Sequence, residues 1–138
     1  MAVIQKSLRI PEEILKEIEQ IAEATQRDFS SVAKELLEEA VKIHRCPGIV
    51  FTEGVRGRRA RVAGTGIEVW EMIATYNSVG RNPGRLRRAY HWLTDQQLKT
   101  AMGYYKAYPE EIDRLIAKNE NWTLERIHKR HPFLPAGK

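Results

Sequence analysis

Arginine is the residue type whose spacing in this sequence could do chemistry. Arg56, Arg58, Arg59 and Arg61 lie close together, and a guanidinium group can form two parallel hydrogen bonds with a carboxylate or a phosphate. The net charge of the chain is +5, and residues 46–92 carry eight arginines against three glutamates. We therefore expect an anionic partner for this region; a basic surface that is only solvated is the alternative.

The other reactive side chains predict no catalytic or metal site. Cys46 is the single cysteine, and we interpret it as an idle or buried thiol. His128 and His131 are spaced as zinc ligands can be, but no cysteine or acidic cluster lies at a matching spacing. The glycines from Gly54 to Gly66 lack the spacing of a phosphate-binding loop. We expect neither a cofactor nor a metal, and a protein that is not an enzyme.

Composition favours a soluble, cytoplasmic protein. The 138 residues are 42% hydrophobic and 30% charged, which is typical of a globular chain. No apolar run reaches the roughly 18 residues that a membrane span needs, so we expect no membrane association. The start of the chain lacks the apolar core of a signal peptide, and a single cysteine fits a reducing compartment.

The first 45 residues predict one strand followed by two helices. Apolar and polar side chains alternate over residues 3–10, which is typical of a strand, and Pro11 suits the first turn of a helix. Apolar residues then recur at helical spacing. After a short break, Ser30 or Ser31 can cap a second helix.

This N-terminal part is too small to bury its apolar faces by itself. Domains of this size usually need disulfides, a metal or oligomerisation, and we expect neither of the first two. A homodimer is therefore predicted, in which two copies of the strand pair antiparallel and cover each other's edges.

The order of these elements resembles the ribbon-helix-helix family. The matching features are the strand, Pro11-Glu12-Glu13, a helix, a short turn with Ser30 and Ser31, and a second helix. That family places a two-stranded ribbon in the major groove of DNA. The resemblance implies that Gln5, Ser7 and Arg9 contact base edges, and that backbone amides near the serine pair hold a phosphate. A dimerisation module that never touches DNA is the alternative.

Residues 46–118 predict a β-hairpin followed by a compact helical cluster. Two short β-rich runs, residues 49–51 and 60–62, flank a glycine-containing turn. Thr94 and Gln97 have the spacing of a capping box at the start of a helix, and Pro109 opens another helix.

This segment resembles a family of small bacterial and archaeal domains, long described as of unknown function and grouped with VapB-like antitoxins. The family's usual Gly-Thr-Arg-Ile has glycine here in place of the arginine. The resemblance implies a helix-turn-helix arrangement and an antitoxin function. The matching residues are Gly57-Arg58-Arg59, the run from Ala63 to Trp70, and Leu93-Thr94 with the helix from Asp95 to Tyr105.

The last segment, residues 119–138, predicts a partner-binding tail. Trp122, Ile127 and Phe133 are apolar side chains spaced among charges, and such spacing suits docking into the groove of a partner. Packing of the tail against its own domain is the alternative.

The predicted fold is mainly α-helical, with a minor β component. A ribbon-helix-helix over residues 1–45 is expected to form an intertwined dimer. A small hairpin plus a helix-turn-helix-like domain follows over residues 46–118, and the tail ends the chain.

A DNA-binding module followed by a partner-binding module is the layout of a type II antitoxin. We expect the chain to neutralise a cognate toxin, with a PIN-domain ribonuclease as the expected class, and to repress its own operon by binding operator DNA. The expected toxin contacts are Arg56, Arg58, Arg59 and Arg61 for an acidic surface, and Trp122, Ile127 and Phe133 as apolar anchors. A stand-alone dimeric transcriptional regulator is the alternative function.

Overall fold

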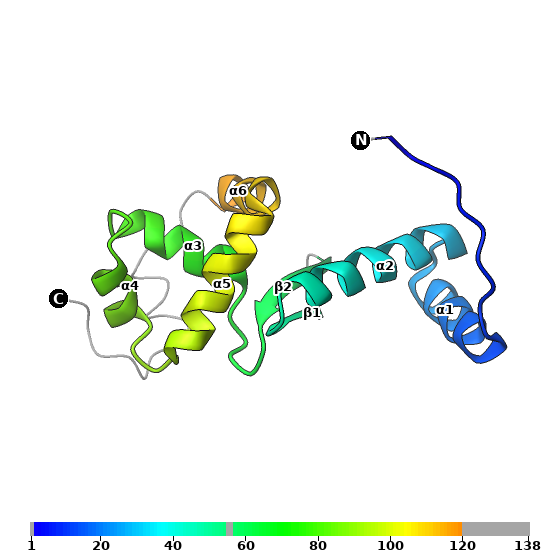
Figure 1. Ribbon diagram of the computed structural model, residues 1–138, viewed down its shortest axis with the longest axis horizontal. Helices are drawn as coiled ribbons and strands as arrows, with labels where there is room; N and C mark the ends of the chain where they lie inside the picture. The colour runs from blue at the N-terminus through cyan, green and yellow to red at the C-terminus, as the bar shows by residue number, and fades with distance from the viewer. Residues whose placement is uncertain (1, 55–56, 120–138) are drawn as a thin grey trace. The chain divides into compact units, whose positions relative to one another are not determined.

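The chain folds into helices with one small β-hairpin in the middle (Figure 1). The computed structural model describes residues 2–54 and 57–119. The chain divides into two compact units, Met1–Val41 and Lys42–Lys138. In chain order, the elements are α1 (Glu12–Thr25), α2 (Phe29–Arg45), β1 (Ile49–Gly54), β2 (Gly57–Val62), α3 (Val69–Ser78), α4 (Pro83–Ala89), α5 (Asp95–Ala107) and α6 (Pro109–Lys118).

Residues 2–11 form no strand, contrary to the sequence-based prediction. Val3, Ile4 and Leu8 are 91%, 83% and 68% exposed. A strand needs a neighbour for its backbone hydrogen bonds, and within residues 2–54 and 57–119 the single sheet joins β1 to β2. The fold therefore begins with helices, and the predicted ribbon-helix-helix fold, with its intertwined dimer, is wrong.

Helix α1 follows Pro11, as the sequence predicts, and ends where the backbone reverses its direction. Glu12 and Glu13 occupy its first turn, where carboxylates interact favourably with the helix dipole. Gln26 follows in the left-handed region with φ of 54°. This turn lets the amide of Arg27 donate to the carbonyl of Ala22 at 2.9 Å, which satisfies one of the last carbonyls of the helix.

Helix α2 is capped by Asp28, and the prediction that Ser30 or Ser31 caps it is wrong. The amide of Ser31 donates to Asp28 Oδ1 at 2.7 Å, and the amide of Val32 donates to the Asp28 carbonyl at 3.2 Å. These bonds satisfy amides that have no partner inside the helix. The two hydrogen bonds with Ser31 lower the pKa of the Asp28 carboxyl below its ordinary value.

Replacing Asp28 with alanine should therefore loosen the start of α2. Because the pKa of Asp28 is lower in the folded chain, its stabilising effect is complete above the unfolded value of 3.8 and is lost as the pH falls through the folded value. Carboxyl NMR titration should give a midpoint below 3.8. At pH 7 the amide of Ser31 should exchange faster in Asp28→Ala and keep its protection in Asp28→Asn, which retains an acceptor. Unchanged exchange in the alanine variant would contradict the cap.

The first unit has a very small core. Its buried apolar side chains are Ile18, Ala22 and Val32, and Phe29, Ala33 and Leu36 pack partly against them. A larger group of apolar side chains in and beside this unit is exposed by 37% or more, and comprises Val3, Ile4, Leu8, Ile10, Ile14, Leu15, Ile21, Leu37, Val41 and Ile43. The unit thus leaves much of its apolar surface in contact with solvent.

The last turn of α2 belongs to the second unit and leads into the hairpin. Gly48 makes the turn with φ of +98°, and a Cβ there would lie 3.1 Å from the Thr100 side chain, so both conformation and space favour glycine. Strands β1 and β2 then pair antiparallel, with Ile49 opposite Val62. The predicted hairpin is confirmed.

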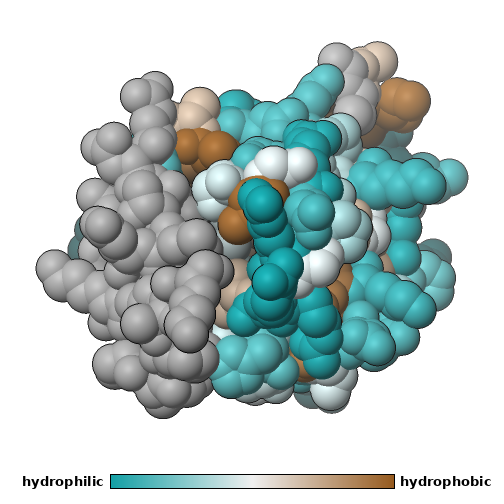
Figure 2. All heavy atoms as spheres, turned by 90° about the vertical axis from the view of Figure 1, so that its left-hand side faces the viewer, coloured by the Kyte–Doolittle hydropathy of each residue, from teal (hydrophilic) through white to brown (hydrophobic). Residues whose placement is uncertain are grey.

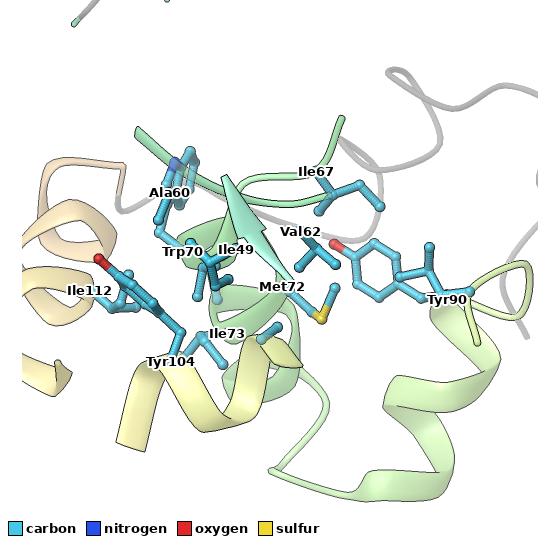
Figure 3. Packing of buried hydrophobic residues seen from close by; sticks show 14 of the residues in the cluster. Ile49, Ala60, Val62, Ile67, Trp70, Met72, Ile73, Tyr90, Tyr104 and Ile112 are labelled. Atoms are coloured by element: carbon cyan, nitrogen blue, oxygen red, sulfur yellow. The ribbon is translucent and has the colours of Figure 1, made fainter. Parts of the chain in front are cut away.

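Helix α3 is the centre of the second unit. All residues from Val69 to Thr75 are buried, so every face of the helix contacts protein, as expected for a core helix. Helices α5 and α6 both pack against it. Figure 3 shows side chains from the hairpin, α3, α5 and α6 converging on one interior. The largest fully buried ones include Tyr90, Tyr104 and Ile73.

The start of α5 confirms the predicted capping box. Thr94 Oγ1 accepts from the amide of Gln97 at 3.1 Å, and Gln97 Oε1 accepts from the amide of Thr94 at 2.8 Å. The bonds fix where α5 begins and thereby how it meets α3.

Candidate functional site

Two arginines of the hairpin, Arg58 and Arg61, form hydrogen bonds and ion pairs within the chain, and a third, Arg59, forms none with the described residues. Arg58 donates from Nη2 to the carbonyl of Phe51 at 3.0 Å, and its Nη1 lies 3.4 Å from Glu53 Oε1. Arg61 donates from Nη1 to the carbonyl of Gly66 at 2.6 Å. Their side chains are 27% and 20% exposed. Both therefore hold the hairpin and the following loop in place.

Arg59 is different. It is partly exposed on β2 opposite Thr52, and no hydrogen bond or ion pair joins its guanidinium to the residues that the structure describes. Its strand neighbour Ala60 is buried, and since successive side chains of a strand point to opposite faces, Arg59 lies on the outer face of the hairpin. It is available to a partner. Arg56 lies outside the described residues.

A second group of arginines lies in α4 and just before it. Arg81, Arg85 and Arg88 are exposed, and none of them forms an ion pair with a carboxylate within residues 2–54 and 57–119. Arg87 instead turns inward: its Nη1 donates to the carbonyls of Tyr90 and Leu93. These arginines contribute to the regional charge seen in the sequence, but no prediction named them as site residues. Their signal was the run from residue 81 to residue 88, which holds four arginines and no acidic residue.

The residues that were predicted to contact DNA lie in two exposed segments of the chain. Gln5, Ser7 and Arg9 are exposed in the segment without secondary structure, and Ser30 and Ser31 are exposed in the first turn of α2. The amide of Ser31, which was expected to hold a phosphate, is already bound to the carboxyl of the capping aspartate. A phosphate at this helix start would meet a carboxylate that is ionised at neutral pH, which disfavours anion binding there.

A network of charge and aromatic rings fixes the end of α2 within the second unit. Lys42 Nζ lies 2.5 Å from Glu111 Oε1 and 5.2 Å from the ring centroid of Tyr108. Tyr104 donates from its hydroxyl to Glu111 Oε2 at 2.7 Å. Burial, followed by the bond with Glu111, raises the pKa of Tyr104, so the phenol stays protonated. The network therefore fixes the last turn of α2 to α5 and α6.

The hydroxyl of Thr75 is buried in the core, and the thiol of Cys46 is partly buried against it. Thr75 Oγ1 lies 3.2 Å from the hydroxyl of Tyr90 and donates to the carbonyl of Glu71 at 3.0 Å. Burial raises the pKa of the Cys46 thiol, which lowers the fraction of reactive thiolate. This agrees with the interpretation of Cys46 as an idle thiol.

The structure gives no metal cluster or membrane helix in its described part. Among residues 2–54 and 57–119, no three histidine, cysteine, aspartate or glutamate side chains come together as metal ligands. No helix within those ranges is long and apolar enough to cross a membrane. The expected apolar anchors Trp122, Ile127 and Phe133 lie outside the described residues.

Comparison with known proteins identifies one family. No curated protein matches the chain. The sequence profile of the family described as "Protein of unknown function (DUF433)" matches residues 49–105. The chain is also similar to a DUF433 member protein from Anabaena variabilis, whose crystal structure is known. The two are 31% identical, and the similarity covers 78% of this chain and 99% of the other, with a TM-score of 0.44.

Proposed function

We propose, from the premise that this chain belongs to the DUF433 family of proteins of unknown function, that it acts by binding and not by catalysis. The proposed role is that of an antitoxin: it neutralises a cognate toxin and represses its own operon by binding DNA. The family description assigns no activity, so the proposal depends on the residues of this chain and on the antitoxin-like motifs in the sequence.

The observation that carries the toxin-binding part is the available guanidinium group on the outer face of the hairpin. Arg59 has no carboxylate partner among the described residues, whereas Arg58 and Arg61 brace the strand on either side of it. A rigid strand thus holds one unpaired cation toward solvent. The toxin class that fits is a ribonuclease with an acidic metal site, because an arginine among metal-binding carboxylates replaces the charge of the cation.

Association with a second copy of the chain is the other part of the proposal. The buried core of the first unit consists of Ile18, Ala22 and Val32, which is far less than an independent domain of this size needs. A second copy offers an identical apolar surface on α1 and α2. Closed pairs of identical subunits are the commonest oligomers, so we propose a homodimer formed through these helix faces.

The test of the toxin-binding part starts with affinity capture of the full chain from its own cells, followed by mass spectrometry. One small protein with an acidic metal site should co-purify, cleave RNA by itself, and lose that activity when the chain is added back. Arg59→Glu should weaken the inhibition by at least about tenfold, because it places like charges opposite each other. Arg114→Glu makes the same change at an exposed position of α6 and should leave inhibition intact.

A stand-alone transcriptional regulator is the second candidate function. It is favoured by the exposed arginines of α4, which need no protein partner to explain them. If the capture yields only DNA and further copies of the chain, this second function replaces the antitoxin proposal.

A further inference from the structure

Three exposed arginines lie in α4 or just before it, and the backbone that carries them is held in place. Arg85 and Arg88 are three positions apart in the helix, which places their side chains side by side. Arg81 lies just before α4, with its Nε donating to Asn77 Oδ1 at 2.9 Å. Asn82 caps the helix by accepting from the amide of Arg85 at 3.0 Å. The three exposed arginines are therefore carried by a backbone that is fixed in place.

The inner face of α4 packs against the core of the second unit. Leu86 is 4% exposed and Tyr90 is 1% exposed, so the inner face of α4 is part of the core. Arg87 ties the end of the helix to the following loop through its bonds to the Tyr90 and Leu93 carbonyls, and its Nε lies 3.3 Å from Asp95 Oδ1. Arg87 thus has a structural role. Arg88 Nε lies 3.4 Å from the carbonyl of Gly84, but Arg81, Arg85 and Arg88 are all exposed and have no carboxylate partner among the described residues.

The positive charge of this surface is not locally balanced. No aspartate or glutamate occurs from residue 72 to residue 94, and Asp95 is paired with Arg87. On α6, Asp113 accepts from the hydroxyl of Tyr105 at 2.8 Å, and Arg81 Nη2 lies 3.5 Å from that same hydroxyl. Arg85 and Arg88 form no ion pair with a carboxylate among the described residues.

The surface is polar as well as charged. All large apolar side chains that are exposed in the described ranges occur before β2, and none is in helices α3–α6. Figure 2 shows the face that carries α4, where teal hydrophilic residues dominate beside the grey atoms. Stable protein interfaces have an apolar centre, whereas sequence-independent binding to duplex DNA needs only cations facing phosphates.

We propose that Arg81, Arg85 and Arg88 form a phosphate-binding surface for duplex DNA. This inference deepens the proposed operon repression and rests on it. The backbone of a duplex presents one charge per about 3.4 Å of axis on each strand. Arginine side chains separated by about 5–6 Å on one helix face can each reach a phosphate oxygen. Arginine presents a planar fork that can donate two hydrogen bonds to such a group.

The experiment measures binding of the full chain to a fluorescently labelled 20-base-pair duplex over a range of salt concentrations. The variant Arg81→Gln/Arg85→Gln/Arg88→Gln should bind at least about tenfold more weakly at low salt, and each lost phosphate contact should reduce the salt slope by about one. The matched control, Lys106→Gln/Arg114→Gln/Lys118→Gln, removes the same charge from α5 and α6 and should bind like the wild type. Circular dichroism checks that both variants are folded.

One further variant and two further measurements, of poly-glutamate binding and of toxin inhibition, distinguish the possible outcomes. Replacing the three arginines with lysine keeps the charge and should keep the salt slope. Equal losses in the glutamine variant and its control would overturn the proposal, as would loss of poly-glutamate binding with duplex binding intact, which would indicate an acidic protein partner. The glutamine variant should still inhibit the captured toxin. Failed inhibition by the wild-type chain, with duplex binding intact, would contradict the antitoxin function alone.

Discussion

Ile73→Ala should lower the free energy of unfolding of the second unit by about 2–5 kcal/mol, the usual range for removing a large aliphatic side chain from a core. Ile73 is 0% exposed at the middle of α3, and the buried side chains around it come from several elements, so the cavity cannot close by moving one of them. The arginine surfaces described above depend on this core, and we expect the variant to lose duplex binding at temperatures where it unfolds.

The measurement is urea unfolding followed by tryptophan fluorescence. All three tryptophans lie after residue 69, so the signal reports the second unit and not the first. Ile14→Ala is the matched control, because Ile14 is 48% exposed in the other unit and its loss should leave this transition unchanged. A change below about 1 kcal/mol for Ile73→Ala would mean that α3 is not the centre of the core.

Leu37→Glu combined with Val41→Glu should convert a dimeric chain into a monomer. The two side chains are 60% and 62% exposed on α2, and they lie four positions apart on one face of the helix. In a symmetric pair each copy contributes both, and burial of each is worth about 1.5–3 kcal/mol. The dissociation constant should therefore rise roughly a hundredfold or more.

Sedimentation equilibrium of the full chain measures this change directly. Val50→Glu is the matched control, since Val50 is a 37% exposed apolar residue on β1 in the second unit, and it should leave the association unaltered. A wild-type chain that stays monomeric at all concentrations would contradict the proposed homodimer. A double variant that associates as the wild type does would show that the interface lies on another face.

Several elements could be predicted because their signals are local. The helical spacing after Pro11, the β-rich runs on both sides of a glycine turn, and the Thr94–Gln97 capping box each act within a few residues of the chain. The cap of α2 was misplaced by a short distance for the same reason: Asp28, Ser30 and Ser31 are all good cap residues. The backbone geometry alone selects Asp28.

The N-terminal strand failed as a prediction because a strand is not a local structure. Alternation over residues 3–10 indicates which side chains would share a face, but the backbone of a strand must bond to another strand. In the structure residues 2–11 form no secondary structure. The sequence pattern could not supply that partner, and so it could not decide the fold of this segment.

The mainly helical character, the central hairpin and the concentration of positive charge in the middle of the chain all follow from the amino-acid sequence. Which arginines can meet a ligand depends on how the chain folds around them. Arg58, Arg61 and Arg87 are held by both carbonyls and carboxylates, whereas Arg59, Arg85 and Arg88 have no carboxylate partner among the described residues, and Arg88 makes one long bond, 3.4 Å, to the carbonyl of Gly84. The physical reason is that charge is a property of composition, but availability depends on backbone carbonyls and acidic groups that folding brings within hydrogen-bond distance.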